Sequence, residues 1–120
     1  MLSKRAADAL ADIVRNIDWA RAFTTNMGYD EFCADVRTVY AVTRCFEIIS
    51  EASRRLPEGL KSRHPTVPWV DIAGAGDVYR HDYEDLVERQ LWHTLQHDLE
   101  PLRQATLKEL ADASGGSTQN

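Results

Sequence analysis

The side chains best suited to chemistry lie in one short segment, Gly76-Asp77-Val78-Tyr79-Arg80-His81-Asp82-Tyr83. On a helix, Asp77 and His81 are four residues apart and share a face. A carboxylate beside an imidazole fixes the tautomer of the ring and favours its charged form, as a general acid–base catalyst requires. The same spacing also suits a helix-stabilising charge network in which Arg80 pairs with Asp77 or Glu84. Both interpretations of the segment therefore stay open.

Two further pairs of side chains have helical spacing. Tyr79 and Tyr83 indicate ordinary aromatic packing or, alternatively, a phenol exposed beside His81 as a hydrogen-bond donor or modification site. His93 and His97 have the spacing of helical metal ligands. No glutamate is placed as in the zinc-protease motif and no third ligand is evident, so we predict a solvated face there, with neither metal nor cofactor.

Basic side chains concentrate shortly before this segment. Cations suit the negative end of a helix dipole, so one interpretation is a solvated helix end. The other is a rim that contacts phosphate groups. The net charge of −5 argues against indiscriminate binding of nucleic acid but permits such a local patch. The residues concerned are Arg54, Arg55, Lys61, Arg63 and His64.

Helical periodicity positions these groups, because apolar residues recur at intervals of three and four along most of the chain. A first helix is expected after a cap at Ser3, ending with Gly28 in the left-handed conformation. A second is expected to run unbroken from a cap at Asp30 to Arg55. Residues 57–68, with three prolines, predict a linker with one short helical turn. The third and fourth helices are expected to begin near residues 68 and 85, with a bend near residue 101.

The inward faces of these helices predict an all-α fold, an antiparallel bundle of four main helices plus a short one. One domain is expected over residues 1–113, followed by a disordered Gly/Ser/Gln-rich tail over residues 114–120. The small residues 73–76 would let this stretch cross another helix or a partner subunit at short range. The residues expected to face inward are Leu10, Ile13, Val14, Ile17, Ala20, Phe32, Val36, Val39, Tyr40, Phe46, Ile49, Leu91, Trp92, Leu95, Leu99 and Leu102.

The two cysteines, Cys33 and Cys45, are twelve residues apart on one expected helix, about 18 Å at 1.5 Å per residue. That separation is too large for a disulfide, and free thiols fit a reducing compartment. No signal peptide is recognisable and no apolar run approaches membrane-spanning length. We therefore expect a soluble cytoplasmic protein with no membrane contact.

An ordered set of motifs over about 90 residues, from Ile13 to Leu102, resembles the HepT-like family, an all-helical branch of the HEPN superfamily. In the second expected helix the matching positions fall between Asp35 and Ala52. The segments 56–65 and 67–69 resemble the connecting loop of the family, and residues 72–74 lead into its signature. The individual matches in the second helix are Asp35, Thr38, Ala41, Arg44, Glu47, Ile48, Ile49, Glu51 and Ala52.

The family signature is an arginine, four to six further residues, and then histidine, any residue and tyrosine. His81-Asp82-Tyr83 matches its second half, whereas the arginine would fall at Gly74, Ala75 or Gly76. Some members resemble Gly-Asn-x-x-Arg-His-x-Tyr instead. This chain is close to that variant, with Asp77 in place of the asparagine and Arg80-His81 retained.

The resemblance implies a homodimeric toxin that cleaves RNA without metal in a cleft shared by the two signatures. Its partner would be a minimal nucleotidyltransferase antitoxin that adenylylates Tyr83. Without the upstream arginine, two alternatives are a degenerate member that binds the transferase or a nucleotide without cleaving RNA, and an accessory domain for a transferase acting on small molecules. The roles implied are acid–base catalysis for His81, phosphate binding for Arg80, orientation of His81 for Asp77, and RNA phosphate contacts for Arg54, Arg55, Lys61 and Arg63.

Overall fold

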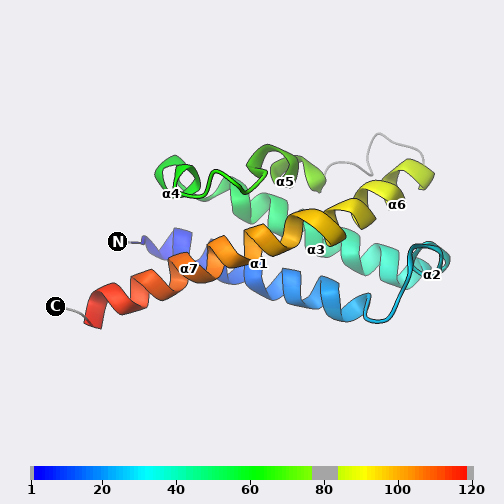
Figure 1. The fold of residues 1–120 in the computed structure, drawn as a ribbon, viewed down its shortest axis with the longest axis horizontal. Coiled ribbons are helices and arrows are strands. Elements are labelled where there is room, and N and C mark those ends of the chain that lie inside the picture. Colours follow the sequence, from blue (N-terminus) through cyan, green and yellow to red (C-terminus); the bar gives the residue numbers. More distant parts are fainter. Residues whose placement is uncertain (1, 77–83, 119–120) are drawn as a thin grey trace.

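Three long helices lie side by side and carry the fold in this computed structural model, which describes residues 2–76 and 84–118 (Figure 1). Helix α1 (Lys4–Phe23) packs against both α3 (Val36–Arg54) and α7 (Leu99–Thr118). The shorter helices α4 (Glu58–Ser62) and α5 (Trp69–Ala75) follow α3, and α5 lies on it. The described residues form helices and no strand, which confirms the all-α bundle.

The polypeptide between α1 and α3 differs from the expectation of one long second helix. Helix α1 ends at Phe23, and the left-handed residue is Asn26, with φ of 64°, rather than Gly28. Gly28 has extended backbone and precedes α2 (Tyr29–Ala34), so the cap expected at Asp30 is wrong. The helix then breaks at Asp35, whose carboxylate accepts a hydrogen bond from the Thr38 N–H at 3.2 Å and caps α3.

The break at Asp35 changes which side of the following helix faces the core. The buried face of α3 includes Thr38, Val42 and Cys45, whereas Val36 and Tyr40 are 63% and 74% exposed. The prediction that Val36 and Tyr40 face inward is therefore wrong. The two cysteines lie on different helices, α2 and α3, and both are free, as expected.

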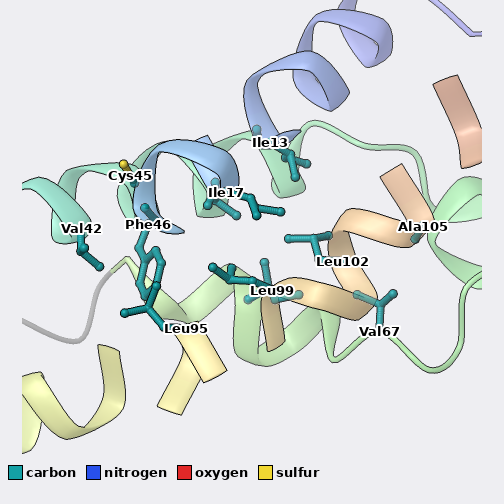
Figure 2. Close-up of a cluster of buried hydrophobic side chains, with 14 of the residues drawn as sticks. Ile13, Ile17, Val42, Cys45, Phe46, Val67, Leu95, Leu99, Leu102 and Ala105 are labelled. Carbon is teal, nitrogen blue, oxygen red and sulfur yellow. The ribbon is translucent and has the colours of Figure 1, made fainter. Parts of the chain in front are cut away.

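One hydrophobic core joins the helices (Figure 2). Ile13 and Ile17 of α1 belong to the same buried cluster as Phe46 of α3, and Leu99 and Leu102 join it from α7. Burial of such side chains supplies most of the driving force for folding, because each removes its apolar surface from water. Most predicted inward positions are confirmed as buried; the exceptions besides Val36 and Tyr40 are Val14, Val39 and Trp92, which are partly buried.

The last third of the chain is a continuous helical rod with one irregular turn. It begins as α6 (Glu84–His93), widens into a π-helical turn η2 (Thr94–Asp98), and continues as α7. The irregularity thus lies just before Pro101, near which we expected a bend. Trp92, two residues before the π turn, packs against Phe32 of α2 with ring centroids 5.3 Å apart.

Helix α7 continues to Thr118, past residue 114, where we placed the start of a disordered tail. The domain boundary at residue 113 stays a prediction. Among the described helices, none combines the length and the apolar character needed to cross a membrane.

Candidate active site

The signature segment runs from the end of α5 to the start of α6. Asp77, Arg80, His81 and Tyr83 lie outside the described residues, so the roles assigned to them stay predictions. The structure describes the two helices that flank the segment, α5 and α6, and the contacts and the cavity beside them.

Helix α3 fixes the C-terminal turn of α5 through a buried serine. The Ser50 hydroxyl donates to the Ile72 carbonyl at 2.8 Å and accepts from the Gly76 N–H at 2.9 Å. Ser50 is 1% exposed, so both backbone groups are satisfied away from water. One turn further along α3, the guanidinium of Arg54 donates to the Ala73 carbonyl. The point from which the signature segment leaves α5 is therefore anchored to a long helix of the core.

The glycines of α5 have opposite surroundings. A Cβ atom at Gly76 would lie 2.9 Å from the Glu47 Cα and 3.2 Å from the Phe46 carbonyl oxygen, so α5 and α3 touch through their backbones there. A Cβ at Gly74 would meet nothing within 4 Å. The expected close helix crossing is confirmed at Gly76, whereas Gly74 is open.

A cavity of about 580 Å³ opens beside Gly74, between α5 and the α6–η2 rod. Its volume lies within the range of small-molecule sites, ~300–1,000 Å³. Its walls carry acidic and basic groups as well as apolar ones. On α5 they include Val70, Asp71, Gly74 and Ala75, and on the rod they include Arg89 and Asp98.

The carboxyl of Asp98 is perturbed by its surroundings in the cavity. Burial raises the pKa of the Asp98 carboxyl above its ordinary range, and the negative charge of Asp71 raises it further, while His93 and His97 act in the opposite direction. The rings of His93 and His97 stack obliquely, with centroids 4.6 Å apart. The part of the chain that the structure describes holds no group of three or more histidine, cysteine or acidic side chains placed to bind a metal ion.

The basic residues predicted to contact phosphate already have partners within the chain. Arg55 lies 3.1 Å from an Asp12 carboxylate oxygen and 3.2 Å from Glu51, and Lys61 lies 3.3 Å from Glu58. Arg54 is bonded to α5 as described above. Phosphate binding by these residues stays a prediction, and it would require each of them to exchange or share a partner.

Arg63, at the end of α4, belongs to a separate cluster around a buried carboxylate of α7. Its guanidinium donates to both carboxylate oxygens of Glu109, at 2.7 and 3.2 Å, and His64 Nε2 lies 2.7 Å from the same carboxylate. Glu109 is 6% exposed, and the hydrogen bond from Arg63 lowers the pKa of its carboxyl despite burial. This cluster ties the loop after α4 to α7.

Sequence reasoning missed two residues beside the signature. Ser50 occupies a buried position of α3, four residues after Phe46, and a polar residue on an apolar face is the signal that could have marked it. Arg89 carries no such signal, because only the fold places it in the cavity wall.

The family model described as "Ribonuclease HepT-like" matches residues 13–109. A protein of Thermococcus cleftensis named "Probable ribonuclease HepT" is 36% identical over 96 residues, which cover 80% of this chain and 87% of that protein. A "Putative RNase" of Methanocaldococcus jannaschii is 31% identical over 106 residues, 88% of each chain. Another, of Caldanaerobacter subterraneus, is 29% identical over 101 residues, 84% of this chain and 89% of that protein. No solved structure matches significantly. The family match and these relatives, covering most of the helical bundle, show that this chain belongs to the HepT-like ribonuclease family.

Proposed function

We propose that this protein is an endoribonuclease that acts without metal as a homodimer, and that it is the toxin of a toxin–antitoxin pair in the cytoplasm. The observation that carries the proposal is the segment Arg80-His81-Asp82-Tyr83 inside a chain matched by the HepT-like model over residues 13–109. The relatives' names support RNA as substrate. The buried anchor at Ser50 supports it as well, because a reactive segment needs a fixed start.

The chemistry would use the RNA's own 2′-hydroxyl as nucleophile. His81 takes the proton of this hydroxyl as its oxygen attacks the adjacent phosphorus, and the bond from phosphorus to the 5′-oxygen breaks. The imidazolium formed on His81 then gives its proton to the leaving oxygen and returns to the neutral form. The products are a 2′,3′-cyclic phosphate and a 5′-hydroxyl. Proton transfer by a positioned imidazole contributes roughly 10²–10⁴-fold. Arg80 would hold the phosphate as negative charge develops on it, and Asp77 would orient the imidazole.

A second copy of the chain would complete the site. Val70, an apolar residue of α5, is 86% exposed and lies one turn before Gly74, beside which there is open space. A dimer that buried this face would bring two signature segments together. Analytical ultracentrifugation of the protein and of Val70→Asp tests the assembly; a monomeric wild type contradicts this part of the proposal.

The partner proposed for the pair is a minimal nucleotidyltransferase that adenylylates Tyr83. Adding a nucleotide to this phenol, two residues from His81, would block RNA from the imidazole. Co-expression with a candidate transferase, followed by intact-mass measurement of wild type and Tyr83→Phe, tests this step. Only the wild type should gain the mass of an adenylyl group.

Cleavage of a labelled RNA, with product ends identified by mass spectrometry, tests the catalytic roles. His81→Ala and Arg80→Ala should each lose at least 100-fold in rate, and a chelator should have no effect. His97→Ala is the matched control, because it removes an exposed imidazole outside the cavity lining and should cleave like wild type. Equal rates for wild type and all three variants would contradict the nuclease proposal.

The sequence also favours a second candidate, a family member that binds the transferase or a nucleotide and leaves RNA intact. The observation behind it is the absence of arginine at Gly74, Ala75 and Gly76. Modification of Tyr83 without any RNA cleavage would favour this candidate.

A further inference from the structure

Most lysine and arginine side chains of this acidic protein already form ion pairs with carboxylates. Few of them are therefore available to bind an RNA phosphate without exchanging a partner. Within residues 2–76 and 84–118, nine lysine and arginine side chains lie in ion pairs: Lys4, Arg15, Arg21, Arg44, Arg55, Lys61, Arg63, Arg103 and Lys108. An arginine outside this set that also lines a cavity is a candidate for binding an anion.

Arg89 meets both conditions. It is exposed on α6 and forms part of the cavity wall, where its guanidinium lies beside the Tyr29 hydroxyl. The facing wall on α5 carries Gly74 and Ala75, and the space beside Gly74 is open. Two of the smallest residues therefore keep this wall of the cavity low, and its volume can hold a group as large as a phosphodiester.

The charges of the cavity also separate along its length. Arg89 and Asp98 are nine residues apart on the same rod, roughly 13 Å at 1.5 Å per residue. Asp98 therefore lies away from Arg89 along the rod, and its charge is influenced by Asp71, which lies one turn before Gly74 on α5. A phosphate would be repelled from the acidic end and attracted to the other. Of the α5 residues in the lining, Gly74 and Ala75 are the two nearest in sequence to Gly76, the last described residue before the signature segment.

We propose that Arg89 binds a backbone phosphate of single-stranded RNA at the α5 side of this cavity, and so supplies from α6 a guanidinium for the signature region. The inference rests on the proposed nuclease function for its substrate class. The guanidinium donates two parallel hydrogen bonds to the non-bridging phosphate oxygens, a geometry that lysine cannot reproduce.

Binding of a fluorescent 2′-O-methyl RNA, which lacks the attacking hydroxyl, measures this contact separately from cleavage. Arg89→Ala should weaken binding ~10- to 100-fold, the range for a hydrogen bond to a charged group. The slope of log affinity against log salt should become shallower by about 0.7, as for one lost phosphate contact. The affinity of Arg89→Lys for the RNA should lie between those of wild type and Arg89→Ala.

Two matched variants separate direct binding from indirect effects. Arg5→Ala removes an exposed arginine at the start of α1, at the opposite end of the molecule from α6, and should bind like wild type (Figure 1). Tyr29→Phe removes the hydroxyl beside Arg89 and should also bind like wild type. If Tyr29→Phe reproduces the loss seen for Arg89→Ala, Arg89 acts by positioning α2 and the proposal is wrong.

A guanidinium moved to the α5 wall of the cavity gives the sharpest test. Gly74→Arg in the Arg89→Ala background places it where the space is open. This double variant should bind the RNA at least tenfold more tightly than Arg89→Ala alone. Wild-type affinity or salt slope in Arg89→Ala, or no RNA binding by wild type, overturns the inference. Binding that depends on Arg89 without cleavage of unmodified RNA would sustain it while the proposed nuclease function failed.

Discussion

The Ser50 hydroxyl accepts a hydrogen bond from the Gly76 N–H at 2.9 Å while it donates to the Ile72 carbonyl at 2.8 Å, so one side chain of α3 holds the last turn of α5. Ser50→Ala should leave this N–H and this carbonyl buried without their partner. We expect a loss of about 1–3 kcal/mol in the free energy of unfolding, measured by urea denaturation.

Ser53→Ala is the matched control for this prediction. Ser53 is 2% exposed on the same helix, but its hydroxyl donates to the Ser50 carbonyl within α3 rather than to α5. Its replacement should cost less, about 0.5–1 kcal/mol, because alanine favours the helix and a neighbouring backbone bond remains. Equal losses for the two variants would mean that the contact with α5 adds nothing to stability.

Gly74 within α5 and Gly76 at its C-terminal cap should respond in opposite directions to the same substitution. Gly76→Ala puts a Cβ 2.9 Å from the Glu47 Cα, and a backbone atom of a core helix cannot move aside cheaply. We expect a loss of about 1–3 kcal/mol, as for overpacking. Gly74→Ala meets open space within a helix and should stabilise by up to ~1 kcal/mol. Thermal unfolding of both variants checks the prediction, and a stable Gly76→Ala protein contradicts the close crossing.

The buried thiol of Cys45 should be inert in the native protein. Burial raises its pKa to about 11, so its thiolate population at neutral pH is about a hundredfold lower than that of an ordinary cysteine. A Cys33→Ser variant leaves Cys45 as the one thiol, and its alkylation by iodoacetamide should be at least 100-fold slower in buffer than in guanidinium chloride. Similar rates in both solvents would show that the Cys45 region opens readily.

The sequence predicted the helices well where one apolar face continues without interruption, as in α1 and along α6 to α7. It failed at Asp35, because an aspartate within a helical pattern also fits a solvent-facing position. The competing effect is local: its carboxylate caps a new helix by accepting from the Thr38 N–H. Once the helix restarts there, the apolar periodicity changes phase, and Tyr40 becomes exposed.

The surroundings of the candidate site were harder to predict than the helices. The contact of Ser50 with Gly76 joins residues 26 positions apart, and it depends on how α5 crosses α3. The position of Arg89 likewise depends on α6 folding back beside α5. Periodicity identifies the buried side of one helix, whereas these contacts depend on how two helices pack. Local spacing and the family resemblance could therefore point to residues 77–83 but not to Ser50 and Arg89 on the neighbouring helices.

The cluster around Glu109 should make stability depend on pH in the acid range. The hydrogen bond from Arg63, followed by that from His64, favours the carboxylate, so its pKa in the folded protein is lower than in the unfolded chain. Its stabilising contribution is therefore complete above the ordinary pKa of a glutamate, about 4.3, and is lost as the pH falls through the lowered value. Stability should decline with acidification for this reason.

Glu109→Gln keeps the shape of the side chain and removes its charge. We expect it to unfold about 1–2 kcal/mol more easily than wild type at pH 7, a modest loss because the Arg63 side chain is 58% exposed. The difference should shrink below about pH 4, where wild type also loses the carboxylate charge. Glu58→Gln is the control, because Glu58 is 92% exposed in its pair with Lys61 and should leave the unfolding curve unchanged at either pH. Urea titrations at both pH values check this, and a Glu109→Gln deficit that stayed constant down to pH 3 would show that the charge of Glu109 is not what stabilises the loop after α4.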